Sequence, residues 1–237
     1  MWCVIPVAGR ATRLAAQAAG RPKALIEIGG RSIIEHLLDR IGPPVTDVCL
    51  VTGATGSERF ARLDAVAAGP RIHLVSQPEP AGVADAVGRA APLVRGPFVV
   101  IMGDCWYERP LADFPERWAA SGADGAVLVE PPTEANGQPV GLVRVVDRRV
   151  TRIFKAPWAD EAEWRVAGAY LFGDSFFEAL TATTPAAASG EVELEDVVTR
   201  LIEAGETFQA IPYAGWRRNI NTPADLQAVR ERIAVAG

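Results

Sequence analysis

The segment from Ile5 to Lys23 carries residue types that bind phosphate. A short apolar run leads directly into Ala8 and Gly9, and the loop that follows holds two cations, Arg13 and Lys23. A turn of small residues lets backbone N–H groups approach phosphate oxygens, and fixed positive charge beside it suits a triphosphate from which pyrophosphate departs. An ordinary strand-to-helix turn with two solvated cations is the competing interpretation.

Asp104 is the candidate metal ligand. It follows the apolar run FVVIMG (98–103), so it is expected at the carboxyl end of a buried strand. A carboxylate beside a triphosphate is what a hard cation such as Mg²⁺ requires. A turn-forming aspartate after Gly103 is the alternative.

The elements that must position these residues alternate through the first half of the chain. Strand patterns at 2–7, 47–52, 72–77 and 97–102 are separated by helical patterns at 32–41, near 56–66 and near 83–93. This alternation predicts a parallel sheet covered by helices on both faces, with ligands at the carboxyl ends of its strands.

After about residue 125 the pattern changes to successive strands, and helices return at about 174–181, 193–204 and 223–234. We expect a small mixed or antiparallel β extension over the carboxyl edge of the sheet, and a last helix capped by Thr222. The fold class is α/β, with a Rossmann-like, mostly parallel sheet in one domain over 1–237. We expect 1–125 to form a nucleotide-binding half, and 126–237 to form an acceptor-binding half that holds the second substrate.

Composition excludes several classes of protein. The 237-residue chain has a formal net charge of -5 and no stripe of Lys or Arg, so no nucleic-acid partner is expected. Its three cysteines have neither disulfide-framework nor zinc spacing. The first apolar run is too short for a signal peptide or a membrane span, which predicts a cytoplasmic protein without a membrane partner. Whether it forms a homo-oligomer is left open.

Several segments together resemble one known family, the sugar-1-phosphate nucleotidyltransferases, and the resemblance covers nearly the whole chain. Its signature is a Gly-rich turn followed by Thr-Arg and, some residues on, Pro-Lys. The matching pieces occur in the family's order: PVAGRATRL (6–14), RPKAL (21–25), QPEPAGVADAV (77–87), MGDCW (102–106), PVGLVRVVD (139–147), IFKAP (153–157), VAGAYLF (166–172), GEVELEDVV (190–198) and NINTPADL (219–226).

The resemblance implies roles for individual residues. Asp104 corresponds to the family's Mg²⁺-binding aspartate, with Asn219 or Asn221 as a second ligand or as part of the helix cap. Arg13 and Lys23 hold the phosphates, and Lys155 holds the acceptor phosphate. The residues expected along the nucleotide are Ala8, Gly9, Arg10, Ala11 and Thr12 at the phosphates, and Gln77 and Gly82 at the base. Those expected along the acceptor are Gly141, Phe154, Gly168 and Glu191, the last equally explained as a helix-start residue.

Two departures from the family pattern stand out. Ala11 replaces the usual second glycine of the turn, which a non-left-handed backbone tolerates. Phe154 stands where the family usually has a Glu that contacts sugar hydroxyls. Because an apolar ring cannot accept those hydrogen bonds, we expect a deoxy or otherwise less polar acceptor.

The implied reaction is Mg²⁺-dependent transfer from a nucleoside triphosphate, UTP or dTTP favoured, to a sugar 1-phosphate, with release of pyrophosphate. Its catalytic residues would be Arg13, Lys23, Asp104 and Lys155. Two alternatives stay open. One is a cytidylyltransferase acting on a polyol or amino-alcohol phosphate, and the other is a non-catalytic nucleotide-binding homologue.

Overall fold

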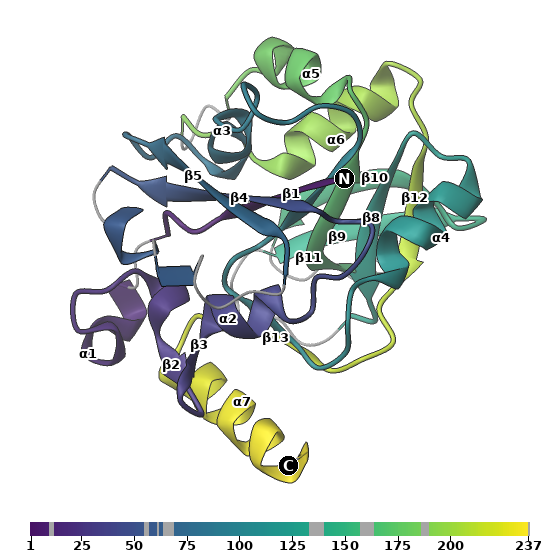
Figure 1. The fold of residues 1–237 in the computed structure, drawn as a ribbon. Coiled ribbons are helices and arrows are strands. Elements are labelled where there is room, and N and C mark those ends of the chain that lie inside the picture. The colour runs from purple at the N-terminus through teal and green to yellow at the C-terminus, as the bar shows by residue number, and fades with distance from the viewer. Residues whose placement is uncertain are drawn as a thin grey trace.

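The computed structural model describes residues 1–9, 12–54, 57–60, 62–63, 69–132, 140–156, 164–185 and 190–236. A nine-stranded sheet in the order β5-β4-β1-β6-β11-β8-β12-β10-β9 forms its centre (Figure 1). The strands are β1 (Trp2–Pro6), β4 (Asp47–Gly53), β5 (Arg71–Gln77), β6 (Phe98–Ile101), β8 (Gly125–Glu130), β9 (Val140–Val146), β10 (Arg149–Ala156), β11 (Trp164–Phe172) and β12 (Phe208–Pro212).

The first four of these strands form the predicted parallel half of the sheet. β1 lies between β4 and β6, and β5 pairs with the outer side of β4, all in parallel. β4 and β6 are buried on both faces, apart from the half-buried Gly53, as expected for strands covered by helices on each side. The loops after β1, β5 and β6 therefore leave the sheet at the same edge.

The strands after residue 125 continue the same sheet instead of lying over its edge. β11 pairs antiparallel with β6 and with β8, and β12 pairs parallel with β8. The edge of β6 that is not paired with β1 accepts β11, and the remaining strands extend the sheet from β11. Sequence patterning alone does not reveal these pairings. A tight turn joins β9 and β10, with positive φ at Asp147 (49°) and Arg148 (64°), as a two-residue hairpin requires.

Two short ribbons complete the sheet structure. β7 (Cys105–Tyr107) pairs antiparallel with β13 (Arg217–Asn219), and β2 (Glu27–Ile28) pairs with β3 (Arg31–Ser32). The first ribbon joins the loop after β6 to the segment before the last helix. It therefore brings together two stretches that are more than 100 residues apart in the sequence.

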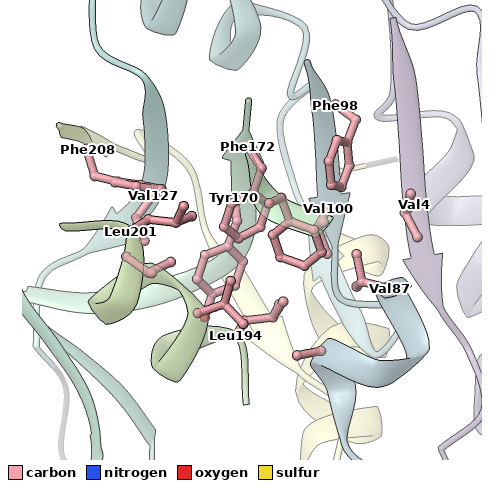
Figure 2. Packing of buried hydrophobic residues seen from close by; sticks show 14 of the residues in the cluster. Val4, Val87, Phe98, Val100, Val127, Tyr170, Phe172, Leu194, Leu201 and Phe208 are labelled. Carbon is pink, nitrogen blue, oxygen red and sulfur yellow. The ribbon is translucent and has the colours of Figure 1, made fainter. Parts of the chain in front are cut away.

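Helices cover both faces of the sheet. The helices of the described residues are α1 (Ala15–Ala18), α2 (Ile33–Leu38), α3 (Val83–Gly88), α4 (Asp113–Ser121), α5 (Phe176–Ala182), α6 (Leu194–Glu203) and α7 (Pro223–Ala236). α1 and α7 lie away from the sheet faces, in a separate cluster with Ile28 and Trp106. α3, α5 and α6 pack on one face around Phe98, Tyr170 and Phe172 (Figure 2). α2 and α4 pack on the other face, against Ile5 and Leu50 among others. In the part of the chain that the structure describes, no helix is both long and apolar enough to cross a bilayer.

Two helical predictions differ from the structure. α3 ends at Gly88 instead of near residue 93, where glycine is a poor helix former and the side chain of Leu180 lies close by. The described part of the region near 56–66 contains a 3₁₀ turn, Ser57–Arg59, while residues 55–56, 61 and 64–68 lie outside the described residues.

Candidate active site

A cavity of about 850 Å³ opens at the carboxyl edge of the parallel strands. Ala8 and Gly9 follow β1 and line it, as does Gln77, the last residue of β5. Gly82 and Glu191 complete the set of predicted residues on its wall. The volume suits a small-molecule ligand. The structure therefore brings the predicted phosphate turn and the predicted base-reading pair to one cavity.

Three polar side chains meet beside this cavity. The Lys23 ammonium donates to Asp104 Oδ2 at 2.9 Å and to Asn221 Oδ1 at 2.6 Å. Lys23 lies on a 3₁₀ turn next to Pro22, which lines the cavity. Because the two oxygens contact one nitrogen, they converge on one cationic position.

The backbone around Asp104 and Asn221 is held firmly. Ile220 N–H donates to the Asp104 carbonyl at 2.8 Å. The Asp225 carboxylate accepts hydrogen bonds from the backbone N–H groups of Asn221 (3.0 Å) and Thr222 (2.8 Å). The Thr222 hydroxyl in turn accepts a hydrogen bond from Asp225 N–H at 3.3 Å, so the predicted cap of α7 is present. The hydrogen bond from Asn221 N–H to Asp225 ties the backbone of Asn221 to the same cap.

The donor set at this position fits Mg²⁺. A carboxylate and an amide oxygen are ligands that Mg²⁺ prefers, and that ion usually completes its shell with water and substrate phosphates. Among the described residues no cluster of three or more His, Cys, Asp or Glu side chains could hold a metal ion, so a metal here would rely on this pair and on the ligand.

Asn219 has a different environment from Asn221. Its Oδ1 accepts from Arg217 Nη1 at 2.7 Å and lies 2.8 Å from Cys105 Sγ. Burial raises the pKa of Cys105 to about 12, so this thiol keeps its proton. The Asn219 oxygen is therefore engaged with the protein, whereas Asn221 faces Lys23.

A second polar group lies around Lys155 on β10. Its ammonium donates to Glu193 Oε1 at 2.6 Å. Burial opposes the charged form, but the carboxylate of Glu193 outweighs it and raises the pKa of Lys155. Lys155 thus carries a fixed positive charge at the amino end of α6, where Glu193 is the N-cap residue.

Two of the predicted acceptor residues lie in different surroundings. Phe154 packs against Arg152, whose guanidinium carbon lies 4.7 Å from the ring centroid. Glu191 lines the 850 Å³ cavity, and its Cβ lies close to Gly82.

The remaining predicted phosphate residues are only partly described. Arg13 lies on the 3₁₀ turn Thr12–Leu14, just before α1. Arg10 and Ala11 lie outside the described residues, as does the side chain of Thr12.

The two predicted acceptor glycines have close neighbours inside the protein. A Cβ on Gly141 would lie 2.6 Å from Glu195 Oε1, and one on Gly168, whose φ is +74°, would lie 2.5 Å from Cys105 Sγ. Packing alone therefore requires glycine at both positions, with or without a sugar beside them.

Comparison with known proteins identifies the family. A family model described as Nucleotidyl transferase matches residues 3–229. The chain belongs to the nucleotidyl transferase family. The resemblance noted in the sequence is thereby confirmed, and this nucleotidyltransferase is an enzyme of the transferase class.

Individual relatives have low sequence identity but align with nearly the whole chain. This nucleotidyltransferase is 26% identical to a UTP–glucose-1-phosphate uridylyltransferase of Haloferax volcanii, over 98% of the chain and 96% of that protein. It is 29% identical to the bifunctional protein GlmU of Methanococcus vannielii, over 95% of the chain but only 53% of that protein.

Solved structures share the fold. A UDP-glucose pyrophosphorylase complexed with UDP-glucose superimposes with a TM-score of 0.82 at 17% identity, covering 100% of the chain and 99% of the other. The inositol-1-phosphate CTP transferase from T. maritima gives 0.81 at 15% identity, covering 98% and 94%. At these identities the likeness concerns the fold alone, and it confirms the predicted α/β class.

Sequence reasoning missed several buried polar residues of this nucleotidyltransferase. Glu195 on α6 accepts from the Tyr170 hydroxyl at 3.0 Å, and burial raises the pKa of its carboxyl. Arg217 is paired with Glu130 through two hydrogen bonds of 2.6 and 3.0 Å. The available sequence signal was Glu130, a charged residue at the end of the otherwise apolar strand β8. Its partner Arg217 lies 87 residues away, so the sequence does not reveal the pair.

The Arg217–Glu130 pair supports a stability prediction. The Arg217 side chain is only 2% exposed and that of Glu130 16%. Glu130→Ala is expected to lower the free energy of unfolding by about 3–5 kcal/mol, because the buried Arg217 guanidinium then lacks the carboxylate that pairs with it. Urea denaturation measures this loss.

Glu27→Ala provides the matched control. The Glu27 side chain is 59% exposed and pairs with Arg21, so its removal should change the free energy of unfolding by less than about 1 kcal/mol. Equal losses in the two variants would mean that the Arg217–Glu130 pair contributes no more than a surface contact.

Proposed function

We propose that this nucleotidyltransferase transfers a nucleoside monophosphate from a triphosphate, UTP or dTTP favoured, to a sugar 1-phosphate, and releases pyrophosphate. The observation that carries the proposal is the convergence of Asp104 and Asn221 on one cationic position, beside the cavity lined by the phosphate turn. The uridylyltransferase from Haloferax volcanii, similar over nearly its whole length, supports the choice of nucleotide and acceptor.

In the proposed mechanism the protein positions the reactants and neutralises charge. Ala8 and Gly9 contact the triphosphate together with Arg13, and the same role is proposed for Arg10, Ala11 and Thr12. An oxygen of the acceptor phosphate attacks the α-phosphorus, and the bond to the departing pyrophosphate breaks on the opposite side. Lys23 stabilises the negative charge that grows on the leaving group.

Asp104 and Asn221 are the proposed Mg²⁺ ligands. Asn221 is preferred over Asn219, because the Asn219 oxygen already accepts from Arg217. Bound there, Mg²⁺ would neutralise phosphate charge. Because the Lys23 ammonium contacts both proposed ligands, it would give up this position to a bound Mg²⁺.

The acceptor is proposed to bind in the 126–237 half of the single domain, opposite the nucleotide half at 1–125. Lys155, held by Glu193, orients the acceptor phosphate. Glu191 accepts from the sugar hydroxyls, whereas Gly141 and Gly168, which pack against protein atoms, shape the wall behind the acceptor. With Phe154 in place of an acid, a deoxy or less polar sugar phosphate is favoured.

Phe154→Glu tests this view of the acceptor. The variant should shift kcat/KM by about tenfold or more toward acceptors with additional hydroxyl groups, since a carboxylate can accept the hydrogen bonds that the ring cannot. Arg152, which now packs on the ring, would pair with the new carboxylate. Phe154→Leu is the control for lost ring volume. An acceptor profile identical to that of the unaltered enzyme would place position 154 outside the acceptor site.

Pyrophosphate release tests the proposed function as a whole. Each of ATP, GTP, CTP, UTP and dTTP is supplied with Mg²⁺ against pooled sugar 1-phosphates and pooled polyol phosphates. Release with UTP or dTTP and a sugar 1-phosphate is the expected result. Release of pyrophosphate only with CTP and a polyol phosphate would indicate a cytidylyltransferase instead. Nucleotide binding without pyrophosphate release would indicate a non-catalytic homologue.

We also propose that the protein is located in the cytoplasm.

A further inference from the structure

We infer that Asp85 is a positioning residue that determines which atom of Gln77 is presented to the nucleobase. Asp85 lies in the first turn of α3 and has no place among the predicted site residues. The inference rests on the proposed function, because it concerns how the same cavity selects its nucleotide.

The hydrogen bonds of Gln77 define the orientation of its amide. Its Nε2 donates to Asp85 Oδ2 at 2.8 Å and to the Gly82 carbonyl at 3.1 Å. Both partners are oxygens that only accept, so the amide nitrogen must occupy this side. An amide turned by 180° would place its carbonyl oxygen against two other oxygens. The planar amide therefore directs Oε1 away from Asp85.

Gln77 is buried as well as oriented. The residue is 6% exposed, and the surface that it retains lines the cavity. Among the described residues no hydrogen bond to its Oε1 is made by the protein. The carbonyl oxygen is consequently the atom of Gln77 that remains for a ligand, and a ligand must satisfy it with a donor.

The two groups that hold Gln77 are themselves held in place. Arg89, one helical turn after Asp85, donates to both of its carboxylate oxygens over 2.9–3.2 Å. Gly82 has a φ of +97°, and its carbonyl also accepts from Ala86 N–H at 3.2 Å. A Cβ on Gly82 would lie 2.6 Å from the Val192 carbonyl, so this backbone has little freedom to shift.

This arrangement restricts the base. A base that presents an N–H to Gln77 gains a hydrogen bond, whereas one that presents a lone pair meets an oxygen. At N3, uracil and thymine carry an N–H where cytosine carries a lone pair, so an Oε1 that faces N3 favours UTP or dTTP over CTP. Asp85 thus acts on selectivity for the base through Gln77, without contacting the nucleotide.

Asp85→Leu separates this role from a general structural one. Asp85 Oδ2 accepts from both Gln77 and Arg89, so an asparagine could keep this bond through its one oxygen, whereas leucine removes both acceptors at similar volume. The Gln77 amide then loses the shorter of its two hydrogen bonds and is oriented by the Gly82 carbonyl alone. The hydrogen bond to the base is weakened, while the turn at Ala8 and Gly9 is untouched.

The experiment is calorimetric titration of the full chain with UTP, CTP and inorganic tripolyphosphate, without acceptor. Asp85→Leu should weaken binding of UTP by about tenfold or more and narrow the UTP-to-CTP affinity ratio. Affinity for tripolyphosphate, which has no base, should stay within about twofold. Asp113→Leu is the matched control, since Asp113 pairs with Arg117 at the same helical spacing on α4.

A double-variant experiment shows whether Asp85 acts through Gln77. In Gln77→Met protein, adding Asp85→Leu should cause no further loss of UTP affinity, because Asp85 acts on the base through Gln77. Independent losses in the double variant would overturn the inference, as would an unchanged UTP-to-CTP ratio or an equal loss for tripolyphosphate. If the unaltered protein binds UTP no better than tripolyphosphate, the proposed function fails together with the inference, and that result is visible before any variant is made.

Discussion

Asp104→Ala is expected to reduce Mg²⁺-dependent turnover by on the order of a thousandfold, the loss typical of removing a group that stabilises transition-state charge. Asp104 Oδ2 is the only carboxylate oxygen that contacts Lys23 among the described residues, so its loss leaves Asn221 alone at the proposed cation position. Steady-state pyrophosphate release measures the effect. The Mg²⁺ concentration that gives half-maximal rate should rise in the same variant.

The fold should survive this substitution. The Asp104 side chain is 27% exposed, and the contacts that hold the loop come from its backbone carbonyl. Asp174→Ala, at an exposed turn between β11 and α5, is the control and should keep full activity. An Asp104→Ala protein with ordinary Mg²⁺-dependent turnover would remove Asp104 from the site.

Lys23→Met is expected to lower kcat by roughly a hundredfold to a thousandfold, because the pyrophosphate leaves without a fixed positive charge beside it. The side chain is 12% exposed, so its charge acts where solvent screens it little. Methionine keeps most of the apolar volume of lysine, which limits packing effects. Rates at saturating nucleotide and acceptor separate this loss from weaker binding.

Lys23→Met should have the opposite effect on metal binding in the absence of nucleotide. The ammonium now contacts both proposed ligand oxygens, so its removal frees them for a cation. Mn²⁺ affinity, followed by electron paramagnetic resonance, should increase in Lys23→Met and decrease in Asp104→Ala. Arg95→Met, at an exposed position that bonds only backbone carbonyls, should change neither quantity. Weaker Mn²⁺ binding in Lys23→Met would contradict a shared cation position.

Sequence patterning predicted the parts of the fold that depend on local periodicity. The buried runs of β1, β4 and β6 and the loops after them follow from apolar strands that alternate with helices. That alternation is enough to place Ala8, Gln77 and Asp104 at one edge of the sheet. The pairing of β11 with β6 could not be predicted, because it depends on a contact between strands about 70 residues apart.

The residue types of the candidate site could be predicted from the sequence, but the contacts that each residue makes could not. Asn219 and Asn221 are equivalent in the sequence, and only the contacts with Arg217 and with Lys23 distinguish them. The role of Asp85 depends on the rotamer of Gln77, which no spacing reveals. Long-range polar pairs such as these are set by the tertiary structure, whereas small-residue turns and strand ends leave a signal in the sequence.

The proposed reaction is attack by an acceptor phosphate on the α-phosphorus of a nucleoside triphosphate. The decisive measurement uses UTP carrying ³²P at the α or at the γ position, with Mg²⁺ and a sugar 1-phosphate, and separates the products. We predict that α-label appears in a nucleoside diphosphate sugar and γ-label in pyrophosphate. Transfer of γ-label to the acceptor, or release of α-label as a free nucleoside monophosphate, would contradict this reaction.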